Sequence, residues 1–187
     1  MAISGLSILI DLDGTLFQLM PRFNQRLKEM FPEITPVPVE QTTDFYVSNL
    51  YLPEHRSKVD QVWTCPSLFK DLSLFPGALE AVLEMSKTND VSLCTSPFAD
   101  NPTCNQDKYD SVYKVFGRAW ADKRLVQTGD KTRICADILI DDKPKIEGVM
   151  NPSWEHVLYD APYNQEIKNK RRLNWQNYKK VLYELFD

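Results

Sequence analysis

The sequence contains no apolar segment long enough to cross a lipid bilayer, which takes about 20 hydrophobic residues in one helix. The first residues also lack the basic start and the small-residue cleavage site of a secretory signal peptide. We therefore expect a cytoplasmic protein that has no membrane partner and no removable leader.

Cysteine pairs are also missing. Cys65, Cys94, Cys104 and Cys135 are widely spaced and form no C-x-x-C motif. This spacing favours reduced thiols in a cytoplasmic protein over a disulfide framework, and we expect the thiols to serve in core packing.

Basic residues are not in excess, since 22 Lys and Arg stand against 26 Asp and Glu, for a formal net charge of −4. They are scattered along the chain, and the pair Arg171–Arg172 is too short to form a nucleic-acid footprint. A binder of polymeric nucleic acid is therefore disfavoured, and we expect a small-molecule partner.

The chain is long enough and apolar enough to form a hydrophobic core. Of its 187 residues, 43% are hydrophobic, enough for one domain or for one domain with a modest insertion. Residues 6–12 form a short apolar run without helical period, which predicts a strand buried on both faces of a parallel sheet.

Two acids and a glycine follow at the end of this strand. Asp11 and Asp13 lie at the carboxyl end, which opens onto the ligand crevice in open α/β sheets. Because side chains two residues apart share a face of an extended chain, both acids can point into that crevice. Gly14 then allows a sharp turn.

A later apolar strand over residues 136–142 brings Asp141 and Asp142 to the same edge. Four neighbouring carboxylates repel one another unless a cation compensates them, which predicts a divalent ion with oxygen ligands, Mg²⁺. A plain Asp-Gly turn is the alternative that the first motif leaves open. A calcium loop does not fit, because Thr15 and Leu16 occupy its fifth and sixth positions.

The alternation of strands and helices is interrupted over residues 18–75. Helical spacing over 21–31 and 53–63, with prolines and aromatic clusters between and after them, predicts a small helical cap inserted after the first strand. The predicted domains are the core, residues 1–17 and 76–187, and the cap, residues 18–75. In the first cap helix the residues at helical spacing are Phe23, Leu27 and Met30.

Polar and basic residues follow the next core strands. A strand over residues 90–94 ends in Thr95 and Ser96, whose hydroxyls suit an anion such as phosphate, although Thr-Ser-Pro is also common turn chemistry. Lys108 lies on the next predicted helix, and Lys131 follows the next short strand. Two further helices are expected to cover the sheet, with apolar stripes of Leu79, Val82, Leu83 and Met85 and of Trp175, Tyr178, Leu182 and Leu185.

The ordered set of D-L-D-G-T, Thr95-Ser96, Lys131 and Asp141-Asp142 resembles the four motifs of the haloacid dehalogenase superfamily of phosphotransferases. That superfamily has a Rossmann-like core with a cap after the first motif. More specifically, longer blocks resemble the 5′(3′)-deoxyribonucleotidases: residues 74–82, 94–97, 130–132, 138–144 and 154–158.

The resemblance implies a role for each motif residue. Asp11 is expected to be the nucleophile that forms an aspartyl-phosphate, and Asp13 the acid and then the base. Mg²⁺ is expected to bind the Asp11 and Asp141 carboxylates and the Asp13 carbonyl, with Asp142 in the outer shell. The residues expected to hold the phosphate are Thr95, Ser96, Lys131 and Lys108.

The resemblance also implies that cap aromatics enclose the nucleobase. The matching residues are Phe45, Tyr46, Val47 and Phe69. Core packing within the cap is the competing interpretation of these aromatics. The chain departs from its relatives at three positions, with Leu19 for Phe, Tyr46 for Trp and Lys143 for Arg, so the base preference stays open.

Two other classes of function remain. A phosphatase for another small phosphorylated metabolite would keep every motif and differ in the cap. A catalytically inactive binding protein is expected to have lost Asp11, Asp13, Lys131 or Asp141, and all four are present. Homodimers are common in the family, but the sequence leaves the oligomeric state open.

Overall fold

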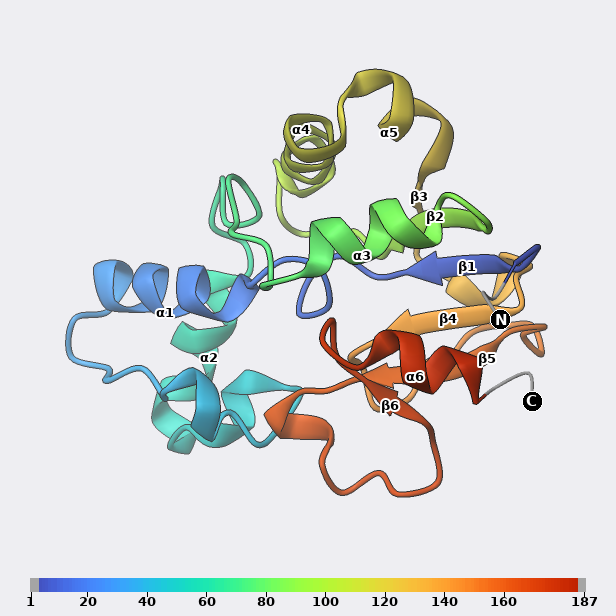
Figure 1. Ribbon diagram of the computed structural model, residues 1–187. Coiled ribbons are helices and arrows are strands. Elements are labelled where there is room, and N and C mark those ends of the chain that lie inside the picture. Colours follow the sequence, from blue (N-terminus) through green and yellow to red (C-terminus); the bar gives the residue numbers. More distant parts are fainter. Residues whose placement is uncertain (1–3, 185–187) are drawn as a thin grey trace.

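The computed structural model describes residues 4–184. Its strands are β1 (Ser7–Ile10), β2 (Asp90–Thr95), β3 (Leu125–Gln127), β4 (Ile138–Asp141), β5 (Glu155–Tyr159) and β6 (Arg172–Leu173). They form one sheet in the order β3-β2-β1-β4-β5-β6, and all neighbouring strands are parallel (Figure 1). The predicted α/β class is therefore confirmed.

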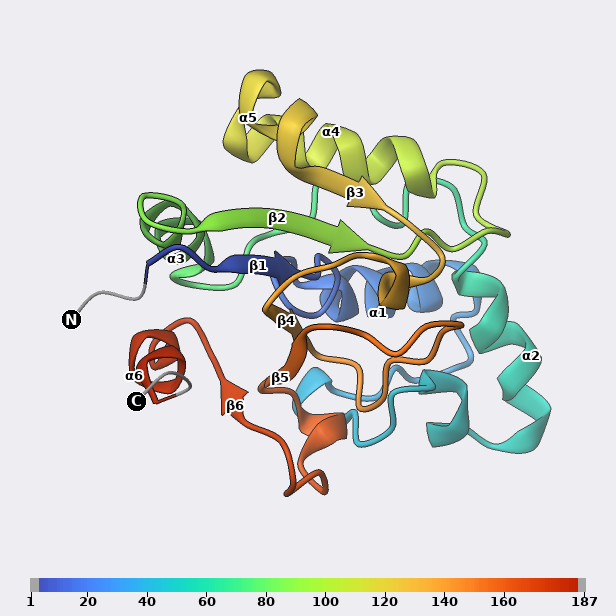
Figure 2. The ribbon, with the colours of Figure 1, turned by 90° about the vertical axis from the view of Figure 1, so that its right-hand side faces the viewer.

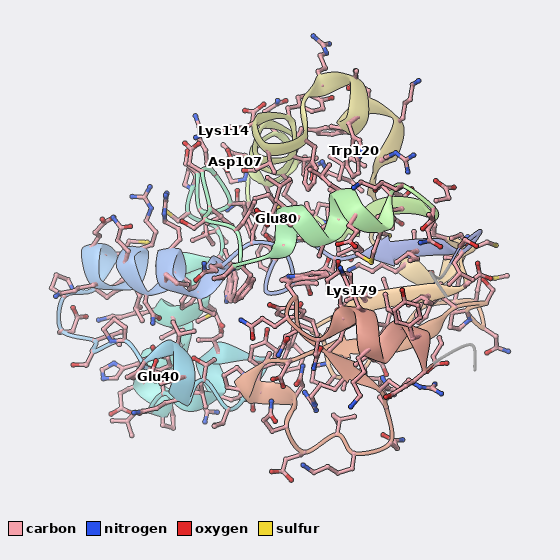
Figure 3. All side chains as sticks on the ribbon, viewed as in Figure 1. Glu40, Glu80, Asp107, Lys114, Trp120 and Lys179 are labelled. Carbon is pink, nitrogen blue, oxygen red and sulfur yellow. The ribbon has the colours of Figure 1, made fainter. Side chains whose placement is uncertain are left out.

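The helices of the core are α3 (Ala78–Met85), α4 (Cys104–Phe116), α5 (Arg118–Arg124) and α6 (Tyr178–Tyr183). Figures 1 and 2 show α3 and α6 on the same side of the sheet, with α4 and α5 beside β2 and β3. Exposed charged side chains such as Glu80 and Lys179 lie on the outer sides of these helices (Figure 3). None of the helices within residues 4–184 has both the length and the apolar character needed to cross a membrane.

The central strand β1 is buried because its side chains alternate between two apolar clusters. Ile8 and Ile10 pack in a cluster that includes residues of α3 to α6, whereas Leu9 packs with Leu139 and Trp154 in another. Burial on both faces explains why this strand is an uninterrupted apolar run and not an alternation of apolar and polar residues.

The cap helices are α1 (Leu19–Met30) and α2 (Pro53–Val62), and four short 3₁₀ turns complete the fold: η1 (Val39–Gln41), η2 (Val47–Leu50), η3 (Lys131–Arg133) and η4 (Pro162–Asn164). Figure 1 shows α1 and α2 beyond the arrowheads of β1 and β4, at the carboxyl edge of the sheet. Phe23, Leu27 and Val59 belong to a hydrophobic cluster of the cap.

The two connections between cap and core are hydrogen-bonded to each other. Gln18 N–H donates to the Ser73 carbonyl, and Phe75 N–H donates to the Leu16 carbonyl, each at 2.8 Å. The chain thus leaves and re-enters the core at adjacent points, close to the predicted boundaries. The division into two domains itself stays a prediction.

Details of the predicted helices need correction. Met30 and Leu83 are 38% and 45% exposed, so neither belongs to the buried face of its helix. On α3 the buried positions are Ala78, Ala81, Val82 and Met85, which follow the helical period, and Leu83 points away from them. Tyr178 and Leu182 of α6 are buried as predicted, as is Trp175 before it, and Leu185 lies outside the described residues.

Candidate active site

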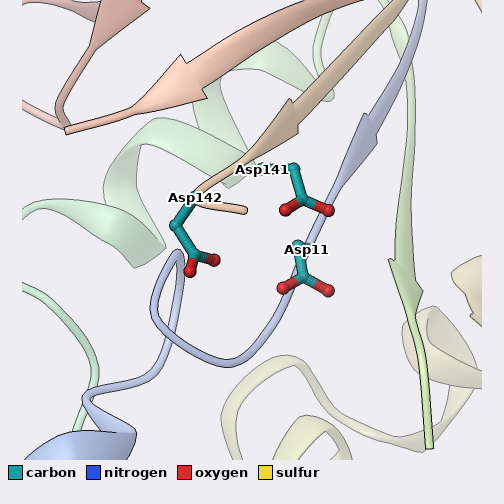
Figure 4. A group of neighbouring side chains, drawn as sticks. All are labelled: Asp11, Asp141 and Asp142. Atoms are coloured by element: carbon teal, nitrogen blue, oxygen red, sulfur yellow. The ribbon is translucent and has the colours of Figure 1, made fainter. Parts of the chain in front are cut away.

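Three of the four predicted acids meet at the carboxyl edge of the sheet. Asp11 directly follows β1, Asp141 ends β4 and Asp142 follows it, and these two strands are neighbours. Each acid offers a carboxylate oxygen, and these oxygens all lie within 4.8 Å of one another (Figure 4). Strands β2 and β3 lie on one side of β1, and β4, β5 and β6 lie on the other, so the strand order changes direction at β1. Ligands bind in such sheets at the carboxyl ends of the strands beside this point, which is where the acids lie.

Lys131 compensates two of these acids. Its ammonium donates to Asp11 Oδ1 at 2.5 Å and to Asp141 Oδ2 at 2.6 Å. Burial alone would lower the pKa of Lys131, but the two carboxylates raise it above its ordinary value, so the side chain is charged. The Lys143 N–H donates to the other oxygen of Asp141 at 2.8 Å, so each oxygen of Asp141 accepts a hydrogen bond.

Asp13 has its own cation. Lys108 Nζ lies 2.7 Å from Asp13 Oδ2 and donates to Thr95 Oγ1 at 2.8 Å and to the Ser96 carbonyl at 2.7 Å. Burial raises the pKa of Asp13, and the Lys108 ammonium opposes that shift. Helix α4 buries Lys108 against the end of β2, which brings together four of the predicted site residues.

Asp142 differs from the other acids in its partners. Its Oδ1 accepts from the Thr15 hydroxyl at 2.9 Å and its Oδ2 from the Tyr163 hydroxyl at 2.5 Å. Burial raises the pKa of Asp142 well above its ordinary range, and the charges of Asp141 and Asp11 add to the shift. The hydroxyl partners of Asp142 carry no positive charge, whereas the Lys131 ammonium is bonded to both Asp11 and Asp141.

Gly14 allows the chain to pass beside this carboxylate. Its φ is +80°, in the left-handed region, and a Cβ there would lie 2.8 Å from Asp142 Oδ2 and 2.9 Å from the Tyr163 hydroxyl. A residue with a side chain would thus be strained and would also collide with the acid and the phenol. The turn predicted at this glycine is confirmed.

The charges and donor atoms fit a divalent cation. Asp11, Asp13, Asp141 and Asp142 contribute four buried or nearly buried carboxylates, and within residues 4–184 the ammonium groups that form ion pairs with them are those of Lys108 and Lys131. When all four acids are ionised, two negative charges remain, which a divalent ion would balance, and carboxylate oxygens are the ligands of hard cations. The structure therefore supports a divalent metal site at the acid cluster.

A cavity of about 530 Å³ joins the acids to the cap. Its lining includes all the predicted catalytic, phosphate-binding and base-binding residues: Asp11, Asp13, Asp141, Asp142, Thr95, Ser96, Lys108, Lys131, Phe45, Tyr46, Val47 and Phe69. Val47 and Phe69 are each 4% exposed, whereas Tyr46 is 63% exposed. Phe45 is half-buried, with its ring centroid 5.4 Å from that of Tyr46.

Several residues that line the cavity were not predicted from the sequence. Trp63 and Phe98 form a stacked pair, with ring centroids 6.1 Å apart, and Tyr163 reaches the acid cluster from η4. No motif marks these aromatics. For Tyr163 one signal was available, because it closely follows the end of β5, at the same edge of the sheet as the other site residues.

Comparison with known proteins identifies the family. Residues 5–185 match the family described as 5′ nucleotidase, deoxy (Pyrimidine), cytosolic type C protein. A Bordetella pertussis protein is 39% identical over 176 residues, which cover 94% of each chain. The human mitochondrial 5′(3′)-deoxyribonucleotidase is 37% identical over 179 residues, covering 91% of this chain and 78% of its own.

A solved haloacid dehalogenase-like hydrolase from Streptococcus pneumoniae superposes with a TM-score of 0.57 at 13% identity, covering 97% of this chain and 98% of its own. At that identity the likeness shows the fold, which agrees with the arrangement of the acids at the edge of the sheet. Together with the family match over nearly the whole chain, these findings establish that the chain belongs to the 5′(3′)-deoxyribonucleotidase family of phosphoric monoester hydrolases and has the fold of a haloacid dehalogenase-like hydrolase.

Proposed function

We propose that the protein hydrolyses deoxyribonucleoside 5′(3′)-monophosphates, of the dUMP and dTMP type, to deoxynucleoside and phosphate. The observation that carries this proposal is one cavity that has clustered carboxylates and lysines at its floor and aromatic side chains from the cap above them. The carboxylates and lysines suit a phosphate and its counter-ion, and the aromatic side chains suit a nucleobase.

Asp11 is the nucleophile of this proposal. Lys131 holds its Oδ1, which fixes the orientation of the carboxylate and leaves Oδ2 to attack phosphorus. The new bond joins Asp11 to phosphorus while the bond from phosphorus to the nucleoside oxygen breaks, which gives an aspartyl-phosphate. Water then attacks that phosphorus and releases Asp11 and inorganic phosphate.

Asp13 is the proton donor and acceptor. Its burial, which raises the pKa of the carboxyl, favours a protonated form that can give its proton to the departing nucleoside oxygen. The resulting carboxylate takes a proton from the attacking water in the second step. Lys108 pairs with Asp13 and donates to the Thr95 hydroxyl, so one ammonium links the acid to a proposed phosphate-binding hydroxyl.

Mg²⁺ is the proposed cofactor, and when bound it would neutralise phosphate and carboxylate charge. The Asp11 carboxylate and the Asp13 carbonyl are its proposed ligands, as the family resemblance implies. The resemblance also implies the Asp141 carboxylate as a ligand, with Asp142 in the outer shell. Of the last two acids, Asp141 is already paired with Lys131, whereas Asp142 has only hydroxyl partners. We therefore propose Asp142 as a direct ligand and Asp141 as the residue that holds Lys131.

The cap supplies the proposed base-binding wall. Phe69 is buried, with its ring 5.2 Å from Lys108 Nζ, and Phe45 and the exposed Tyr46 line the same cavity. Stacking accepts any base, so these residues explain binding of a nucleoside without fixing its identity. A ribose 2′-hydroxyl left without a partner in this wall would cost about 1–3 kcal/mol, which favours deoxyribose.

A cytoplasmic location is proposed as well, in agreement with the cytosolic type named in the family description. The human relative is named as mitochondrial, so membership of the family does not decide the compartment. A homodimer remains a prediction.

Phosphate release from a panel of nucleoside and deoxynucleoside monophosphates, with and without Mg²⁺, tests the proposal. We expect turnover that EDTA abolishes and Mg²⁺ restores, with dUMP hydrolysed about ten- to hundredfold better than UMP in kcat/KM. Undiminished turnover in excess EDTA would exclude the metal site. Equal rates on UMP and dUMP would favour a phosphatase for other small metabolites.

Substitution separates the two acids that follow β4. Asp142→Asn should weaken Mg²⁺ binding directly, whereas Asp141→Asn should act mainly by releasing Lys131. Direct titration of Mg²⁺ into each metal-free variant distinguishes these effects. Equal Mg²⁺ affinity in Asp142→Asn and the unmodified protein would contradict the proposed ligand.

A further inference from the structure

Tyr163 contacts both ends of the cavity. Its hydroxyl donates to Asp142 Oδ2 at 2.5 Å, and its ring packs edge-on against Phe45, with centroids 5.7 Å apart. We propose that Tyr163 is a positioning residue that holds the Asp142 carboxylate for the cation and supports Phe45 for the base. This inference rests on the function proposed above.

The turn that bears Tyr163 is fixed to the sheet. Asn164, which is fully buried, donates from Nδ2 to the Asp142 carbonyl and to the Tyr159 carbonyl, both at 2.8 Å. Arg172 donates to both the side-chain oxygen and the carbonyl of Asn164. Turn η4 is thereby bonded to the ends of β4 and β5, so Tyr163 stands on a rigid support and not on a free loop.

The hydroxyl acts on the orientation of one carboxylate. Thr15 holds Oδ1 of Asp142 and Tyr163 holds Oδ2, so rotation of the carboxylate would break at least one of two hydrogen bonds. Each oxygen keeps a lone pair for a cation, because a carboxylate accepts about four bonds. Outer partners of this kind orient metal ligands, and their loss commonly weakens metal binding by about 10- to 100-fold.

The ring acts on the cap. Phe45 lies on the irregular segment between η1 and η2, so no helix or strand fixes its position. Its ring lies beside those of Tyr163 from the core and the exposed Tyr46, and the Lys143 ammonium lies 5.3 Å from its centroid. Of these residues, Tyr163 lies on turn η4, which is hydrogen-bonded to the ends of β4 and β5. Tyr163 therefore fixes the position of the Phe45 ring.

The two roles can be measured separately. Tyr163→Phe removes the hydroxyl and keeps the ring, so Mg²⁺ affinity should fall by about 10- to 100-fold while the ratio of KM for dUMP to KM for p-nitrophenyl phosphate stays within about twofold. Tyr163→Leu removes both groups and should in addition raise that ratio several-fold, because p-nitrophenyl phosphate has no nucleobase. Calorimetric titration of Mg²⁺ into the EDTA-treated, dialysed protein gives the affinity without turnover.

Tyr178→Phe is the matched control. It also removes a phenol that donates to a carboxylate, here Glu84 at 2.9 Å, and it lies outside the cavity lining. Both Mg²⁺ affinity and the KM ratio should equal those of the unmodified protein. Unchanged Mg²⁺ affinity in Tyr163→Phe would overturn the hydroxyl role, and an unchanged KM ratio in Tyr163→Leu would overturn the ring role.

Phe45→Leu gives an independent test should Tyr163→Phe fail to fold. Loss of the Phe45 ring should raise the KM ratio while Mg²⁺ affinity stays that of the unmodified protein, because Tyr163 is held by the hydrogen bonds of η4 and not by Phe45. An unchanged KM ratio would overturn the support of the base through Phe45, and a fall in Mg²⁺ affinity would overturn the rigid support of Tyr163. If the proposed substrate is wrong, the unmodified protein should hydrolyse p-nitrophenyl phosphate but no nucleotide. The Mg²⁺ titrations need no substrate, so they would still decide the role of Tyr163.

Discussion

Replacing Lys131 by methionine is expected to destabilise the fold in a way that Mg²⁺ partly reverses. Methionine keeps the length and apolar character of the side chain but removes the ammonium between Asp11 and Asp141. Lys131 is 6% exposed, so water cannot replace the lost charge. The two carboxylates would then be buried beside each other without their shared cation.

Removing one partner of a buried ion pair typically costs about 3–5 kcal/mol, because the other charge stays buried and uncompensated. The loss of Lys131 also raises the pKa of Asp11 in the folded state further above its value in the unfolded chain, because the Lys131 charge no longer opposes the effect of burial. Between those two pKa values the folded state binds more protons, so the penalty grows as pH rises and is larger at pH 7.5 than at pH 5. A cation at 100 times its Kd restores about 2.7 kcal/mol.

Urea unfolding of Lys131→Met and the unmodified protein, at both pH values and in EDTA or Mg²⁺, measures these differences. Lys114→Met is the control, since Lys114 is 70% exposed and its 2.8 Å pair with Asp71 is screened by water. If Lys131→Met in EDTA at pH 7.5 is as stable as the unmodified protein, the argument that charge compensation holds the acid cluster together is refuted.

Three further predictions concern single residues. Asp13→Asn should slow phosphoryl transfer from dUMP more than from p-nitrophenyl phosphate, whose leaving group needs little protonation, and equal losses in single-turnover kinetics would remove the acid role. Phe69→Ala or Tyr46→Ala should raise KM for dUMP and leave KM for p-nitrophenyl phosphate unchanged. An equal rise in both KM values would show that these side chains serve in packing of the cap. Burial, with the charge of Lys170, lowers the pKa of His156 to about 4. As pH falls, the unfolded chain therefore takes up this proton at a higher pH than the folded protein does. Between pH 7 and 4 this difference should lower the free energy of unfolding by about 3 kcal/mol. His156→Gln should abolish that part of the loss, measured by unfolding in EDTA across this pH range.

The strands and the order of the motifs could be predicted because they are local properties of the chain. Apolar runs such as residues 6–12 and 136–142 are too short and too continuous for anything but buried strands, and an acid after such a strand lies at the carboxyl edge by necessity. The meeting of Asp11, Asp141 and Asp142 at one edge therefore follows from sequence alone, whereas the catalytic roles of Asp11 and Asp13 stay proposals. Helix α5 and strand β6 were missed, since 7 and 2 residues are too few for a periodic pattern.

Pairings between distant residues were decided by the tertiary structure. Lys131 meets Asp11 across 120 residues of sequence, and Thr15 meets Asp142 across 127. The structure also exposes Tyr46, buries Phe69 and brings Tyr163 between the cap and the acids. These outcomes depend on which strands are neighbours and on how a turn is bonded to their ends. A local sequence pattern places a polar side chain at one edge of the sheet, but only the packing of the whole chain determines which residues it contacts there.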